Sequence, residues 1–270
     1  YGSESFRDRV PSADATLVTR LKAAGCINLG KLTMSELAMV GPPGFGKETL
    51  NPWNTSHAPG GSSSGSATAV AAGLCAGSIG SDTGGSIRFP AANNNIVGLM
   101  PTYGRVSRKG VMPLSWTLDH VGPMTRTVED AALMLHAISG FDPADKTTST
   151  ESVSDFRSEL SPDIKGLKIG ILEDSFVDIH PDIEEAMERS IKVFEALGAQ
   201  LCPVRIPNYR VLHIANSIIY LVEGFNNFGT RLREDSSKLG KIFRIYGYMG
   251  GLFSADEYVQ AMRLRSRTRV

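Results

Sequence analysis

The chain has 270 residues, 41% of them hydrophobic and 21% charged, which is ordinary for a globular protein. Its 28 basic and 28 acidic residues cancel, so the net charge gives no indication of nucleic-acid binding. No apolar run approaches the roughly 20 residues that span a bilayer, which argues against a membrane-spanning protein. We therefore expect a protein that contacts neither nucleic acid directly nor a membrane; we also expect it to be cytoplasmic, because its cysteines are predicted to be free thiols.

The cysteines and histidines form no pattern typical of a metal site. Cys26, Cys75 and Cys202 are widely spaced and have apolar neighbours, which predicts buried free thiols rather than disulfides. The five histidines show no clustering of the H-E-x-x-H kind. We expect neither a metal ion nor any other cofactor.

The beginning of the chain predicts two helices separated by a strand. Ser12 is a good N-cap for a helix over 13–24, whose apolar residues recur on one face. The apolar stretch 26–29 predicts a short strand. Thr33, followed three residues later by a glutamate, resembles a capping box and predicts a second short helix.

The stretch 41–49 nearly matches a phosphate-binding P-loop. Gly41, Gly46 and Lys47 have the required spacing, but Glu48 stands where a serine or threonine is needed to reach magnesium. A helical segment also precedes it where a P-loop requires a strand. We interpret it as a surface loop and not as a nucleotide site.

Two glycine-pair turns, Gly60-Gly61-Ser62 and Gly84-Gly85-Ser86, are the most informative part of the sequence. Residues 64–75 between them predict a helix, and residues 76–81 predict a short buried strand. Glycines let a backbone approach a ligand without a Cβ clash, and free N–H groups can converge on one point as in an oxyanion hole. The alternative, a flexible Gly/Ser linker, lacks such helix and strand patterns.

The stretch after the second turn predicts a strand over 96–100 and a helix over 128–139, with Thr127 as its N-cap. Asp119 and His120 look like a catalytic acid and base. However, neighbouring residues of a strand point to opposite faces, so we do not expect this pair to act together as acid and base.

The polar residues 142–162 predict a linker or a long surface excursion. A strand over 166–172, a helix over 183–197 and a strand over 199–204 then predict a βαβ unit with parallel strands. Further helices are predicted over 209–224 and 254–270.

The two turns and the stretch after them resemble the amidase signature family. The family reads approximately GGSSGGS, DTGGSIR and GLKPT-x-GRVS, where this chain reads GGSSSGS, DTGGSIR and GLMPTYGRVS. Ser64 thus replaces a family glycine. The resemblance extends from Tyr1 to at least Pro143, and it implies further sequence before and after this chain. It also implies a single domain over 1–270 with an α/β fold, a mixed, mainly parallel sheet flanked by helices.

The resemblance implies a Ser–Ser–Lys triad instead of a histidine-based one. Ser86 matches the family nucleophile, and Ser62 matches the bridging serine, whose preceding peptide bond is cis in the family. The family lysine lies in a motif that would precede Tyr1. Lys31 belongs to a later family block, so we do not expect it to be the catalytic base.

Further site residues follow from the same resemblance. The main-chain N–H groups of Thr83, Gly84 and Gly85 would bind the oxyanion. Ser63 would contact the substrate. The arginines near the C-terminus are typical of a solvated helix face, but the family brings an arginine from this region to the substrate, and Arg265 is our candidate.

These matches predict an amide-bond hydrolase that releases ammonia or an amine from a small amide through an acyl-enzyme on Ser86. We expect no activity from the 270-residue chain by itself. We expect a homodimer, unless the chain is the A subunit of a glutamyl/aspartyl-tRNA amidotransferase, which acts with partner subunits. An alternative from another class is a non-catalytic binding protein with a degenerate amidase fold.

Overall fold

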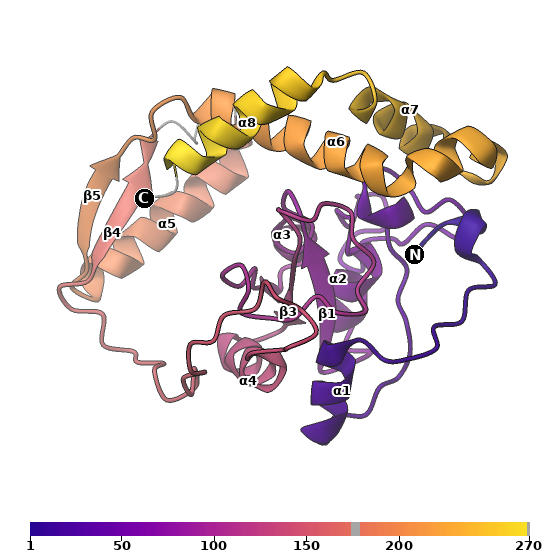
Figure 1. Cartoon of the computed structure of the whole chain (residues 1–270). Coiled ribbons are helices and arrows are strands. Elements are labelled where there is room, and N and C mark those ends of the chain that lie inside the picture. Colours follow the sequence, from indigo (N-terminus) through magenta and orange to yellow (C-terminus); the bar gives the residue numbers. More distant parts are fainter. Residues whose placement is uncertain (174–178, 269–270) are drawn as a thin grey trace. The chain divides into compact units, whose positions relative to one another are not determined.

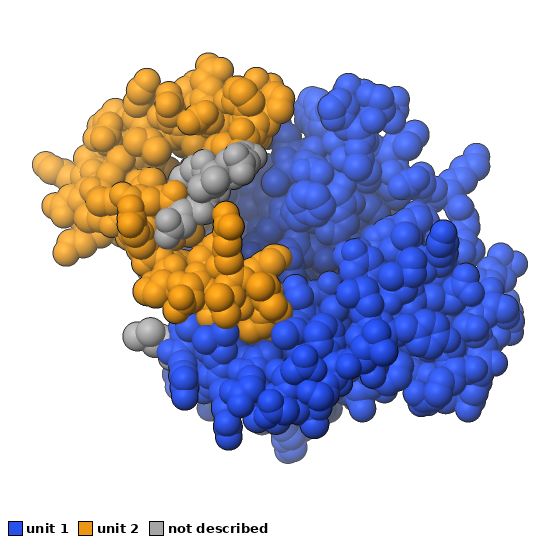
Figure 2. Space-filling view, turned by 90° about the horizontal axis from the view of Figure 1, so that it is seen from above, with its two compact units in different colours: residues 1–157, 216–270 blue, residues 158–215 orange. Residues whose placement is uncertain are grey.

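The computed structural model describes residues 1–173 and 179–268, which fall into two compact units (Figures 1 and 2). Unit 1 comprises Tyr1–Arg157 and Asn216–Val270, and unit 2 comprises Ser158–Ala215. The first boundary lies within the polar stretch 142–162, where the sequence predicts a linker or an excursion. No described helix is long and apolar enough to cross a membrane.

Unit 1 contains a three-stranded sheet in the order β1-β3-β2, built from Gly77–Asp82, His120–Thr125 and Val97–Gly98. β3 is antiparallel to both neighbours, and Asp82 lies opposite His120. The predicted α/β class is confirmed, but the pairing in this unit corrects the expectation of a mainly parallel sheet. The connection from β1 to β3 is long enough for the chain to return in either direction, so the apolar pattern leaves strand direction open.

Four helices of unit 1 precede or surround this sheet (Figure 1): α1 Thr16–Ala23, α2 Ser64–Ala71, α3 Arg88–Asn93 and α4 Val128–Ile138. The predicted N-cap of α4 is confirmed, because Thr127 Oγ1 accepts a hydrogen bond from Asp130 N at 3.1 Å. α2 is made of small residues and packs closely on β1, with Ala67 and Val70 fully buried. The capping-box segment forms only a short 3-10 turn, Glu36–Ala38.

Two expectations about the apolar stretches are wrong. Residues 26–29 form no strand, and Ile27 and Leu29 are 87% and 77% exposed. The three cysteines are free thiols, as predicted, but Cys26 and Cys202 are exposed and Cys75 is half-buried. Apolar neighbours in sequence do not bury a residue when no other element of the described chain packs on it.

Unit 2 is the predicted βαβ unit. β4 Lys168–Leu172 and β5 Gln200–Val204 pair in parallel, and Ile169 lies opposite Leu201. α5 Pro181–Ala196 connects them, with proline at its first position, where the missing N–H costs nothing.

The C-terminal part contains α6 Tyr209–Glu234, α7 Lys241–Gly250 and α8 Ala255–Thr268, and short 3-10 turns occur at Glu4–Phe6 and Ser236–Lys238. α6 continues ten residues beyond the predicted end at Gly224. A Cβ on Gly224 would lie 3.1 Å from Leu114 Cδ1 and 3.2 Å from Met39 Cε, so this glycine permits close packing and does not end the helix.

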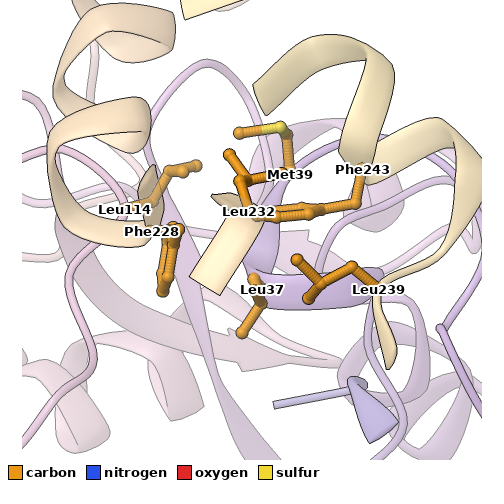
Figure 3. Close-up of a cluster of buried hydrophobic side chains, with 7 residues drawn as sticks. All are labelled: Leu37, Met39, Leu114, Phe228, Leu232, Leu239 and Phe243. Atoms are coloured by element: carbon orange, nitrogen blue, oxygen red, sulfur yellow. The ribbon is translucent and has the colours of Figure 1, made fainter. Parts of the chain in front are cut away.

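The largest buried cluster joins the N-terminal segment to α6 and α7 (Figure 3). Phe228 and Phe243 meet edge to face with ring centroids 5.7 Å apart, and Leu232 beside them is fully buried. The cluster consists of Leu37, Met39, Leu114, Phe228, Leu232, Leu239 and Phe243. It fixes α6 against the loop that contains Leu114.

We expect Leu232→Ala to lower the free energy of unfolding by about 2–5 kcal/mol, because it leaves a cavity in this cluster. The matched control is Leu252→Ala, at a position 84% exposed, which should change stability by less than about 0.5 kcal/mol. Urea unfolding of the two variants measures both values. Equal effects of the two substitutions would contradict the assigned core.

Candidate active site

The second glycine turn is organised by the carboxylate of Asp82, the last residue of β1, which is completely buried. Its Oδ1 accepts from Gly85 N at 2.7 Å, and its Oδ2 accepts from Ile87 N at 3.2 Å. The Arg88 guanidinium donates to both oxygens at 3.0 Å. This one side chain therefore folds the turn back over the end of β1 and begins α3.

The electrostatics of Asp82 favour its ionised form. Burial alone would raise its pKa, but the hydrogen bonds and positive charge of Arg88, with the N–H groups of Gly85 and Ile87, hold the pKa below its usual range. Sequence reasoning did not identify Asp82 as a site residue. The signal was an aspartate three residues before Gly85, a spacing at which a carboxylate can cap a turn.

The structure brings the two glycine turns together. Ser63 N donates to the Ser86 carbonyl at 3.3 Å. Ser86 is half-buried at the end of its turn. Gly85 before it has φ of +122°, a backbone conformation that favours glycine.

Ser62 lies in the first turn, and the predicted cis peptide bond between Gly61 and Ser62 is present. The side chain is 2% exposed. Its Oγ has no hydrogen-bond partner among the described residues. Ser62 thus presents a buried hydroxyl that makes no hydrogen bond to any described residue.

Ser63, the expected substrate contact, is bonded to the sheet. Its Oγ accepts from Ser81 N at 3.1 Å and approaches the Ser81 carbonyl at 3.3 Å. These contacts tie the start of α2 to β1. Ser64 is the first residue of that helix, so its replacement of a family glycine requires no left-handed backbone.

The backbone donors around Ser86 differ in their availability. The Gly85 N–H, one of the expected oxyanion donors, is already bonded to Asp82. Within residues 1–173 and 179–268, the N–H groups of Thr83, Gly84 and Ser86 make no hydrogen bond. The turn therefore presents unpaired donors next to a serine hydroxyl, an arrangement suited to binding an oxyanion.

Asp119 lies in the loop before β3, and His120 is the first residue of β3, so the two are not neighbours on one strand as expected; their side chains have different partners. Asp119 is 6% exposed and accepts from Thr83 Oγ1 at 2.6 Å and from Leu114 N at 2.9 Å. Burial raises its pKa, although these bonds and those of Ser115 oppose the shift. His120 Nδ1 lies 2.6 Å from the Leu118 carbonyl, and burial lowers the pKa of this imidazole. Asp119 thus holds the loop before β3 against the turn that contains Ser86.

Arg265 on α8 is half-buried and donates to the Thr117 carbonyl. Thr117 Oγ1 also donates to the buried Glu223 of α6, at 2.8 Å. Tyr258 donates to the same carboxylate at 2.8 Å, and burial together with Glu223 raises the tyrosine pKa to about 12. Arg265 therefore lies against the loop that leads to Asp119.

The remaining candidates lie outside this arrangement. Lys31 is exposed and belongs to a segment without regular structure. The described residues contain no group of three or more histidine, cysteine or acidic side chains that could hold a metal ion.

Residues 1–263 match the family model described as Amidase. The chain belongs to this family, which confirms the resemblance noted in its sequence. It is 45% identical over 246 residues to the A subunit of glutamyl-tRNA(Gln) amidotransferase from Syntrophobacter fumaroxidans, covering 88% of this chain and 49% of that protein. The chain thus spans about half the length of the curated relatives it matches.

Solved structures of the family are similar. A protein from a vestigial complex that reveals the origins of an s-triazine catabolic enzyme superposes with a TM-score of 0.90 at 36% identity, over 99% of this chain and 59% of its own. The peptide amidase of Stenotrophomonas maltophilia superposes with a TM-score of 0.80 at 34% identity. The match covers 92% of this chain and 57% of the peptide amidase.

We expect Asp82→Asn to lower the free energy of unfolding by about 1–3 kcal/mol, because a charge-assisted buried network is lost. Since the folded pKa is below the ordinary value of about 3.9, the stabilisation is fully present above that value and is lost as the pH falls through the folded pKa. The difference in the free energy of unfolding between wild type and variant should therefore be constant from about pH 5 to 8 and become smaller below about pH 4.

Urea unfolding between about pH 3 and 8 measures this difference. The control is Asp14→Asn, whose exposed ion pair with Lys22 should contribute less than about 1 kcal/mol. If the stability difference between wild type and Asp82→Asn grew as the pH falls, Asp82 would not be the ionised, stabilising carboxylate described above.

Proposed function

We propose that the protein hydrolyses amide bonds through an acyl-enzyme on Ser86. The observation that carries this proposal is the set of unpaired N–H groups beside Ser86, at a turn fixed by Asp82. Ser86 Oγ would attack the amide carbonyl carbon, and the N–H groups of Thr83, Gly84 and Ser86 would stabilise the oxyanion. The amine would leave with a proton, and water would then hydrolyse the ester.

Ser62 would relay the proton between Ser86 and the lysine of the family triad, which the resemblance assigns to sequence before Tyr1. A serine hydroxyl is a poor nucleophile without such a base. The unpaired Ser62 Oγ supports this role, because a buried hydroxyl without a partner costs about 1–3 kcal/mol. A relay that bonds it on both sides removes this cost.

Arg265 is our proposed contact for an acidic or polar acyl group. A guanidinium has five N–H donors, so its bond to Thr117 leaves others for a ligand. A contact of the substrate with the Ser63 hydroxyl would require its bonds to Ser81 to break. We therefore rank Ser63 below Arg265.

A second candidate is the A subunit of a tRNA amidotransferase. It is favoured by the 45% identity to a relative of that name. The same Ser86 chemistry would then release ammonia from glutamine within a complex. A non-catalytic binding protein is the remaining alternative, and labelling of Ser86 by a fluorophosphonate probe in the full-length gene product would contradict it.

In an active full-length protein, Ser86→Ala should abolish amide hydrolysis, because it removes the hydroxyl that attacks the carbonyl carbon. Ser62→Ala should leave a small residual activity, since it removes only the relay. Steady-state kinetics and intact mass spectrometry measure turnover and acyl-enzyme. Normal acyl-enzyme accumulation on the Ser86→Ala protein would overturn the assignment.

The amidotransferase alternative predicts that glutaminase activity requires partner subunits. Ammonia release from glutamine should then be at least about tenfold faster in the assembled complex than in the isolated protein, as expected when partners complete the site. Ammonia assays with and without co-expressed subunits make the comparison. Equal rates in both preparations would favour a stand-alone amidase.

A further inference from the structure

Within the described residues, neither the backbone conformation nor the packing requires a glycine at position 84. Its φ lies outside the left-handed region. A Cβ at this position would have one neighbour within 4 Å, Asn216 Nδ2 at 3.5 Å, which is an ordinary van der Waals contact. By contrast, a Cβ on Gly60 would lie 2.9 Å from Pro90 Cα. Gly84 is exposed, so the space that it leaves open is accessible to a ligand.

Asn216 borders this open space from α6 and is half-buried. The helical period places Glu223 and Asn227 on the same face of α6, two and three turns further along. Asn227 Nδ2 donates to the Leu114 carbonyl at 3.0 Å, and Glu223 accepts from Thr117 N at 3.0 Å. This face of α6 is therefore held against the loop before β3.

That loop is bonded in turn to the second glycine turn, which contains Ser86. Asp119 Oδ1 accepts a hydrogen bond from the hydroxyl of Thr83, the residue before Gly84, at 2.6 Å. Asn216 is thus positioned over Gly84 by bonded contacts that run through α6 and the loop. Its carboxamide offers two N–H donors and one oxygen acceptor.

We propose that Asn216 is a substrate-positioning residue, whose side-chain N–H donates to an oxygen of the acyl group lying over Gly84. The inference rests on the proposed function, because Ser86 must hold the substrate at this turn. It implies a substrate class: amides whose acyl group carries a second oxygen acceptor besides the scissile carbonyl.

The test compares kcat and KM of full-length protein for a panel of primary amides with and without such an oxygen. The panel begins with glutaramate and pentanamide, which differ by a carboxylate in place of a methyl group. Asn216→Ala should lower kcat/KM about tenfold for the oxygen-bearing amides, mainly through KM, the size of one lost hydrogen bond. It should change the others by less than about twofold.

Two variants serve as controls. Asn226→Ala changes an exposed residue of α6 that lines a separate cavity with Phe225 and Arg233, and it should leave both kinetic constants unchanged. Gly84→Ala should keep the melting temperature of wild type, because its Cβ meets only Asn216. It should lower kcat/KM for all amides at least about tenfold, because the Cβ occupies the substrate's space.

The outcomes separate the two proposals. Equal losses for both kinds of amide in Asn216→Ala, or no loss in either, overturn the role of Asn216 while Ser86→Ala remains inactive. Unfolding of Gly84→Ala overturns the argument from open space. An active Ser86→Ala protein, or a wild type that hydrolyses no amide of the panel, overturns the proposed function itself.

Discussion

The buried carboxylate of Asp82 is the interaction on which the candidate site depends. A charge without solvent is stable only when it is paired and hydrogen-bonded, and Asp82 achieves this with the Arg88 guanidinium and three backbone N–H groups. These partners all lie within residues 85–88, so the hydrogen bonds to the carboxylate fix the conformation of the whole turn. By engaging the N–H of Gly85, it also determines which neighbouring donors stay available beside Ser86.

Other buried, hydrogen-bonded carboxylates occur elsewhere in unit 1. Glu36 is 2% exposed, and its two oxygens accept from Ser3 Oγ at 2.6 Å and from Gly240 N at 2.8 Å. Glu223 joins α6 and α8 to the loop before β3. Buried carboxylates thus hold together segments with little regular structure, because each offers several acceptor positions to loops that have spare N–H groups.

This construction explains how one face of α6 reaches the site. The apolar cluster around Leu232 and Phe243 fixes the helix in place, while its polar face bonds to the loop before β3. Packing supplies most of the stability, and the hydrogen bonds specify the orientation. Gly224 is needed at this contact because a side chain there would meet Leu114 and Met39.

Local signals were sufficient for part of the fold and of the site. The Thr127 cap, the βαβ unit of unit 2 and the two glycine turns all follow from residues that lie close together in sequence. The cis bond before Ser62 followed from the resemblance to the amidase signature family. For these elements, capping chemistry, apolar periodicity and motif spacing are enough.

Tertiary structure decided the rest. The antiparallel direction of β3, the exposure of Cys26 and the continuation of α6 past Gly224 all depend on elements distant in sequence. Asn216, whose Nδ2 would lie 3.5 Å from a Cβ on Gly84, is 132 positions away in sequence (216 minus 84), and no local pattern encodes this proximity. The sequence by itself located the two glycine turns, because each turn is built from adjacent residues. The surroundings of the turns come from packing between remote segments, which only the folded chain defines.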